Sequence, residues 1–130
     1  MKPSPAFLFL LLISLSFFGP SCALMPSDSP EIVLVEFPVL PEQRDAFIEE
    51  LHGILPATRD WEGCLAAEVW TASEDADKVW IYEEWTHREA QQYYVAWRGE
   101  SGTTAHLGPY IQGPVRFLWI TEHHPVESSQ

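Results

Sequence analysis

Five side chains in the second half of the chain have the chemistry needed to bind an apolar ligand and orient its oxygen atoms. Trp85 and Trp97 could wall an apolar pocket, and the Tyr94 hydroxyl could donate a hydrogen bond to a ligand oxygen. His106 is of the type that usually carries protons near neutral pH, and the Arg116 guanidinium could stabilise an anionic oxygen. We therefore predict Tyr94 and His106 as catalytic residues and Trp85, Trp97 and Arg116 as substrate-binding residues.

Plain structural roles for the same residues stay open. A Trp or a Tyr brings a large apolar area to any core, so Trp85 and Tyr94 could simply pack there. A single His near a rim is often only solvated, and no partner for His106 is visible from its spacing in the sequence. Strand alternation places Arg116 on the same face as Leu118, so its role depends on where that face points.

Other catalytic signatures are absent from the sequence. It contains no G-x-S-x-G, H-E-x-x-H or C-x-x-C motif and no glycine-rich phosphate loop. His123 and His124 are neighbours near the end of the chain, where no third ligand is suitably spaced, so we expect no metal site. The pairs Glu49–Glu50 and Glu83–Glu84 are interpreted as solvated positions or a strand end. Neighbours on a strand point to opposite faces and cannot share a proton.

The elements that must position these residues follow a regular order. Apolar side chains at helical spacing predict a helix that starts at Pro41 and is stopped near its end by Pro56. Thr86 and Glu89 have the spacing of a capping box, which predicts a second helix that ends at residues 99–102. Runs rich in β-branched and aromatic residues predict four strands. These strands are residues 31–39, 63–71, 77–85 and 115–121, and a short helical segment is predicted near residues 104–111.

The order of these elements is β-α-β-β-α-β, which predicts an α+β fold, a ferredoxin-like antiparallel sheet with both helices on one face. Both alternating faces of the first strand carry apolar residues, with Ile32 and Leu34 on one side and Val33 and Val35 on the other. A lone domain of this size would leave one apolar face in water. We therefore predict a homodimer that packs sheet against sheet.

The first 23 residues are predicted to be a secretory signal peptide. One basic residue precedes an apolar run over residues 6–18, and Ser21 and Ala23 are the small residues before a cut after Ala23. The run is too short for a comfortable membrane span, so we expect none after cleavage. The predicted location is therefore periplasmic or secreted. Lipidation of Cys22 is less favoured, because Gly19 stands where a lipoprotein motif needs an aliphatic residue.

One domain is predicted for the mature chain. Residues 24–30 form a polar leader, residues 31–122 the domain and residues 123–130 a polar tail. The formal net charge of -12 repels phosphate groups, so nucleic acid and anionic membrane surfaces are not expected as partners. Cys64 is the only cysteine after the predicted cut, so an internal disulfide cannot form there. We expect its thiol to be a buried structural group.

Four short motifs give the chain a resemblance to a known family. The motifs are Trp61–Leu65 (WEGCL), Glu84–Trp85, Tyr94–Gly102 (YVAWRGESG) and Pro114–Phe117 (PVRF). Together with the order of the elements, they resemble antibiotic biosynthesis monooxygenase (ABM) domains over about residues 31–122. The resemblance implies a dimeric α+β barrel. In the better-known members it also implies oxidation of phenols, quinols or polyketide aromatics by oxygen, without flavin or metal.

Two residues of related proteins have no counterpart in this chain. Haem-degrading relatives carry a His in the stretch where this chain has Tyr94 and Val95, so we expect no haem. Well-understood oxygenases of the family use an Asn beside the substrate, and this chain contains no Asn. We predict a cofactor-independent monooxygenase that acts on a small aromatic quinol or phenol in an apolar pocket. The alternative is a non-enzymatic small-molecule-binding protein of the same fold.

Overall fold

Four strands, two α-helices and two short 3-10 helices make up residues 29–123, the part of the chain that the computed structural model describes. The predicted signal peptide, with Cys22 and the cut after Ala23, and residues 124–130 of the tail lie outside the described residues. The elements are β1 (Glu31–Pro38), η1 (Pro41–Gln43), α1 (Arg44–Arg59), β2 (Cys64–Trp70), β3 (Lys78–Trp85), α2 (Arg88–Ser101), η2 (Ala105–Tyr110) and β4 (Arg116–Ile120).

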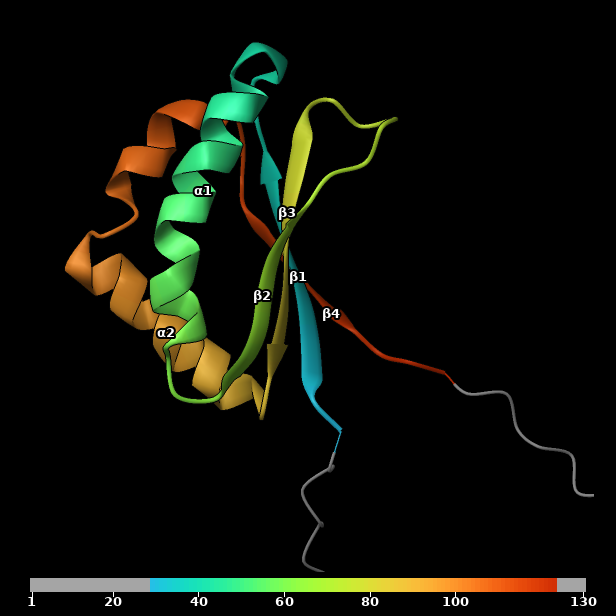
Figure 1. Ribbon diagram of the computed structural model, residues 1–130, viewed down its shortest axis with the longest axis vertical. Coiled ribbons are helices and arrows are strands. Elements are labelled where there is room, and N and C mark those ends of the chain that lie inside the picture. The colour runs from blue at the N-terminus through green and yellow to red at the C-terminus, as the bar shows by residue number, and fades with distance from the viewer. Residues whose placement is uncertain (1–28, 124–130) are drawn as a thin grey trace, which may run out of the picture.

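The four strands form one antiparallel sheet in the order β2-β3-β1-β4. In the centre of the sheet, Val35 of β1 lies opposite Ile81 of β3 and Phe117 of β4. Helices α1, α2 and η2 all lie on one side of the sheet, and the other side is uncovered in the single chain (Figure 1). The predicted ferredoxin-like α+β fold is therefore confirmed, as a sheet that stays open within one chain.

The alternation of β1 explains which face the helices cover. Val33, Val35 and Phe37 are buried, whereas the residues between them are only half-buried. Helix α1 meets this face with Phe47 and Leu51, which are fully buried and one helical turn apart. Burying each such side chain stabilises the fold by about 1.5–3 kcal/mol, so this contact holds α1 on the sheet.

Helix α1 differs from its prediction at both ends. Pro41 begins a 3-10 turn, and α1 itself starts at Arg44. The prediction that Pro56 stops α1 is wrong, because the helix continues to Arg59 with Pro56 inside it. Thr58 is fully buried beyond the proline. The backbone N–H of Asp60 donates to the Pro56 carbonyl at 3.0 Å, so the last turn keeps both packing and a hydrogen bond.

The predicted capping box at the start of α2 is also wrong. The N-cap is His87, and no side chain makes a capping hydrogen bond there. The Thr86 hydroxyl lies 2.9 Å from Nδ1 of His87 instead, and the Thr86 backbone N–H donates to the Gly63 carbonyl at 2.8 Å. The predicted end of α2 is confirmed at Gly102, whose φ of 66° suits a residue without a side chain.

Among the described residues, no helix is long and apolar enough to cross a bilayer.

Candidate functional site

A cavity of about 280 Å³ lies between the helix-covered face of the sheet and helices α2 and η2. Val35, Ile81 and Phe117 form part of its floor on three neighbouring strands. Phe117 belongs to the edge strand β4 and is 44% exposed, so the cavity lies near this edge of the sheet. Its lining is mainly apolar. The exceptions with polar or charged side chains are Glu83, Tyr94, Arg98 and Thr104.

Glu83 places a carboxyl group in this apolar lining. It lies on β3 and is only 3% exposed. Nε1 of Trp85, two residues along the same strand, donates to Glu83 Oε2 at 2.9 Å. Burial raises the pKa of the Glu83 carboxyl to about 7, although the hydrogen-bonding groups of Trp85 and Gln91 oppose that effect. Glu83 therefore changes its charge near neutral pH.

Of the two interpretations of the Glu83–Glu84 pair, the strand end is right, because both residues lie near the end of β3, but Glu83 is not solvated. Alternation does separate it from Glu84, which lies on the uncovered face and accepts a hydrogen bond from the Tyr82 hydroxyl at 2.5 Å. Glu83 instead shares its face with Ile81 and Trp85, which the helices cover. The signal was present in the sequence, because Glu83 interrupts an apolar row of alternate residues on this strand.

Gln91 lies beside Glu83, and its amide acts on the Glu83 carboxyl. Its side chain is 3% exposed, and its amide lowers the pKa of Glu83, although Nε2 makes no hydrogen bond of good geometry within residues 29–123. Gln91 lines a second cavity of about 390 Å³, and Val95 and Phe117 line both cavities. The Gln91 amide therefore belongs to the polar surroundings of Glu83.

Tyr94, one of the two predicted catalytic residues, lines the cavity but has its hydroxyl engaged. Arg98 Nε donates to this hydroxyl at 2.8 Å, and Thr58 Oγ1 lies 2.5 Å from it. The Thr58 hydroxyl donates to the Ile54 carbonyl at 3.4 Å, which leaves Tyr94 as the donor to Thr58. The Tyr94 proton is therefore already used within the protein. Its oxygen can offer a ligand only a further acceptor position.

Arg98 is a buried cation whose hydrogen-bond partners are all neutral. It is 8% exposed and donates to Tyr94, to Thr103 Oγ1 at 3.1 Å and to the Ile54 carbonyl at 3.1 Å. Its guanidinium carbon lies 4.9 Å from the centre of the Trp97 ring and 5.2 Å from that of Tyr94. No carboxylate of the described residues forms an ion pair with it. Buried charges are usually paired, so Arg98 gives the cavity an unneutralised positive charge.

The two predicted tryptophans lie behind the cavity wall. Trp85 is fully buried, and its ring centre lies 5.5 Å from that of Tyr94. Trp97 packs on Trp61 with 5.0 Å between ring centres. Neither Trp85 nor Trp97 is a lining residue of the cavity. Both rings contact the ring of Tyr94, outside the lining of the cavity.

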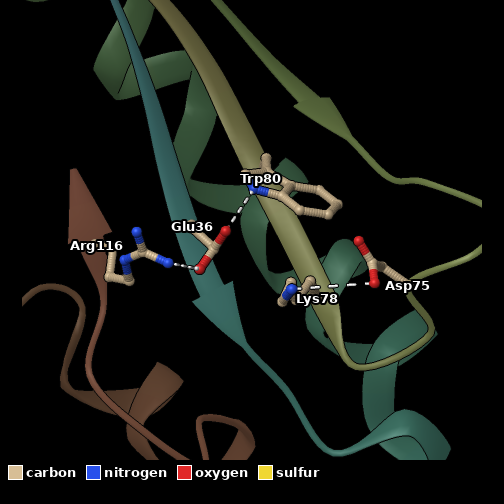
Figure 2. Close-up of polar contacts among 5 residues, drawn as sticks. All are labelled: Glu36, Asp75, Lys78, Trp80 and Arg116. Carbon is tan, nitrogen blue, oxygen red and sulfur yellow. Dashed lines mark hydrogen bonds and ion pairs between the residues drawn. The ribbon is translucent and has the colours of Figure 1, made fainter. Parts of the chain in front are cut away.

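Arg116 and His106 lie away from the cavity. Arg116 extends over the uncovered face of the sheet and pairs with Glu36 at 3.2 Å, and Glu36 also accepts a hydrogen bond from Trp80 (Figure 2). His106 is half-exposed on η2, and its Nε2 lies 3.4 Å from a carboxylate oxygen of Glu50 on α1. The structure thus brings only Tyr94 of the five predicted residues into the cavity lining. The roles predicted for the other four stay predictions.

The described residues offer little else for catalysis. No group of three or more His, Cys, Asp or Glu side chains between residues 29 and 123 is placed to hold a metal ion. Cys64 is partly buried and has no disulfide partner. Burial and, to a smaller extent, the neighbouring Glu83 together raise the pKa of its thiol to about 11. The thiol is therefore protonated at neutral pH, as a structural cysteine would be.

The antibiotic biosynthesis monooxygenase family matches residues 30–102 of the chain, which is more than half of its length. The protein belongs to the antibiotic biosynthesis monooxygenase family. The predicted resemblance is thereby confirmed. No curated protein matches the chain in sequence.

Solved structures share the fold of this family member at low sequence identity. A conserved protein of Methanosarcina mazei Go1 is 16% identical, with a TM-score of 0.63 over 75% of this chain and 97% of the other. A Streptomyces coelicolor monooxygenase, solved with nanaomycin D, is 23% identical, with a TM-score of 0.61 over 78% and 95%. A Mycobacterium tuberculosis protein is 22% identical, with a TM-score of 0.58 over 76% and 100%. These similarities establish the fold.

Proposed function

We propose that this ABM protein is a cofactor-independent monooxygenase that oxidises a small aromatic quinol or phenol in the cavity beside α2. The observation that carries the proposal is an apolar cavity whose lining holds a buried carboxyl, Glu83, and a buried guanidinium, Arg98, that form no ion pair with each other. Membership of the family supports oxygenase chemistry. The complex of the Streptomyces coelicolor monooxygenase with nanaomycin D supports a small-molecule ligand.

The size of the cavity favours a small substrate. Its volume of about 280 Å³ lies near the lower end of ligand pockets, which span roughly 300–1,000 Å³. A molecule of one or two fused rings fits this space better than a larger one. The apolar side chains would hold the ring, and the few polar groups would orient its oxygen atoms.

The reaction would draw its electrons from the substrate itself. A quinol anion reduces oxygen, one oxygen atom replaces a ring hydrogen, and the other leaves as water. Two electrons come from oxidation of the quinol to the quinone and two from hydroxylation of the ring, which together reduce one O₂. The protein supplies a dry pocket and fixed charges near the developing anion.

Oxygen uptake by the purified mature protein tests this proposal. We expect uptake with reduced quinols in the presence of a metal chelator and without added flavin. The product should gain one oxygen atom and lose two hydrogens by mass spectrometry. Val95→Trp, which fills the cavity, should abolish the uptake, whereas Glu100→Trp on the exposed side of α2 should not. Ligand binding without oxygen uptake would contradict the proposal and favour the non-enzymatic binding protein.

A homodimer formed through the uncovered face of the sheet is part of the proposal. That face carries Leu34 opposite Tyr82 and Leu118, and Ile120 is 43% exposed there. A second copy would cover this apolar surface. Light scattering should give twice the chain mass, and Leu34→Asp should give a folded monomer. A wild-type monomer at micromolar concentration would contradict it.

Export is the remaining part of the proposal. It is supported by the apolar run over residues 6–18 and by the small residues before Ala23. Amino-terminal sequencing of the protein from its native source should start at Leu24. A chain that still begins with Met1 would contradict export by cleavage.

A further inference from the structure

We propose that Glu83 is the catalytic base of this site, and that it takes the hydroxyl proton of the bound aromatic molecule. The inference rests on the proposed function and assigns its first chemical step. It concerns a residue whose carboxyl lies in the cavity lining together with Tyr94 and Arg98.

The position of Glu83 suits proton abstraction from an apolar ligand. Among the described residues that line this cavity, Glu83 alone carries a carboxyl. The hydrogen bond from Trp85 Nε1 holds Oε2 in place, so the orientation of the carboxyl is fixed before a ligand enters. The amide of Gln91 lies beside the carboxyl and, like the Trp85 indole, favours its charged form.

The groups that surround Glu83 are neutral or bonded elsewhere, so burial has the largest effect on its ionisation. Cys64 on β2 is a protonated thiol, and the Trp85 indole and Gln91 amide are neutral donors. Arg98 is in the same lining but bonds to Tyr94, Thr103 and Ile54 rather than to Glu83. On β1, the adjoining residues Val33 and Val35 are apolar. No cation therefore holds Glu83 in its charged form.

This environment makes Glu83 a stronger base than an ordinary carboxylate. Burial raises the pKa of Glu83 to about 7, which brings it closer to the value of about 10 for a phenol. Proton transfer is most efficient when the base is still ionised at the working pH but binds a proton well. Above neutral pH, Glu83 meets both conditions.

The step moves one proton and leaves the electrons on the substrate. The O–H bond of the phenol breaks, the proton binds a carboxylate oxygen of Glu83, and the electron pair stays on the phenolate oxygen. The charge of the site is unchanged, because Glu83 becomes neutral as the substrate becomes an anion. Arg98, whose partners are all neutral, then stabilises the new anion across the cavity.

Glu83→Gln tests the role with little change in shape, because the new amide oxygen can still accept the hydrogen bond from Trp85. Glu84→Gln is the matched control, since Glu84 is the next residue on β3 and lies on the opposite face. Both variants are checked for folding by circular dichroism. Deuterium incorporation into the ring of 1,3-dihydroxybenzene, followed by NMR in D₂O without oxygen, reports formation of the anion. Oxygen uptake with quinols is measured separately.

We expect the wild type and Glu84→Gln to accelerate deuterium exchange equally, and Glu83→Gln to be about 10²–10⁴-fold slower. The wild-type rate should rise with pH and level off above about pH 7, and Glu83→Gln should lose this rise. Exchange without oxygen uptake would support Glu83 as the base while contradicting the oxygenase. Oxygen uptake that survives in Glu83→Gln would overturn the base and leave the oxygenase intact. The absence of exchange in the folded wild type would also overturn the base.

Discussion

Glu83→Gln should make the protein more stable at alkaline pH. The carboxyl of Glu83 is 3% exposed and has no cationic partner among the described residues. Ionising such a group inside an apolar lining costs free energy, because water no longer solvates the charge. Glutamine keeps the shape and the acceptor for Trp85 Nε1 but never ionises.

The size and sign of the effect follow from the pKa of Glu83 in the folded and the unfolded chain. The pKa rises from 4.5 to about 7 on folding, so the folded state binds the proton more tightly. Stability due to this group is complete below pH 4.5 and is lost as the pH rises to about 7. Each pH unit between the two values corresponds to about 1.36 kcal/mol. Glu83→Gln should therefore be more stable than wild type by roughly 3 kcal/mol at pH 8 and by less than about 1 kcal/mol at pH 5.

Urea unfolding at fixed protein concentration measures this difference. The free energy of unfolding in water is extrapolated at several pH values for wild type, Glu83→Gln and Glu84→Gln. The difference between Glu83→Gln and wild type should grow between pH 5 and 7 and then stay constant. Glu84→Gln should follow the wild type, because Glu84 lies on the uncovered face. If the free energy of unfolding changed with pH in the same way for Glu83→Gln and wild type, the conclusion that burial raises the pKa of Glu83 would be refuted.

The other predictions concern the groups around this carboxyl. Tyr94→Phe should lower the free energy of unfolding by about 1–3 kcal/mol, measured in urea, because Arg98 Nε loses its buried acceptor. Trp85→Phe should raise the pKa of Glu83 further by removing the hydrogen bond that opposes burial, and NMR titration of this carboxyl should show the change. Cys64 should react slowly with a thiol reagent at pH 8 in the folded protein and rapidly in urea. Fast reaction of the folded protein would contradict the raised pKa of its thiol.

The fold was predictable because it depends on patterns repeated along whole elements. Four apolar strands and two helices in the order β-α-β-β-α-β leave few ways to build a sheet whose one face is covered by the helices. The helix ends were less predictable, because they depend on single contacts across the structure. Pro56 is tolerated where buried Thr58 holds the last turn of α1, and Thr86 bonds to His87 and Gly63 rather than capping α2.

The candidate site was harder to predict because the sequence does not say which face of a strand is covered. Tyr94 was found as an aromatic residue on the inner face of a helix. Arg98 stands in the last turn of α2, where the sequence gives no sign that it is buried and donates to the Ile54 carbonyl on α1. Arg116 was placed on the correct face by alternation, but that face is the one away from the cavity.

Two carboxylates of this sheet differ in whether a cation compensates their charge. Glu36, on the uncovered face, accepts hydrogen bonds from Trp80 and from the cation Arg116, so its charge is compensated (Figure 2). Glu83, on the covered face, has only neutral donors, although an apolar residue would pack there at lower cost. Folding alone gives no reason for an uncompensated carboxyl in this position. A perturbed titratable group in a cavity is the arrangement expected of a catalytic base, which is why the site centres on Glu83.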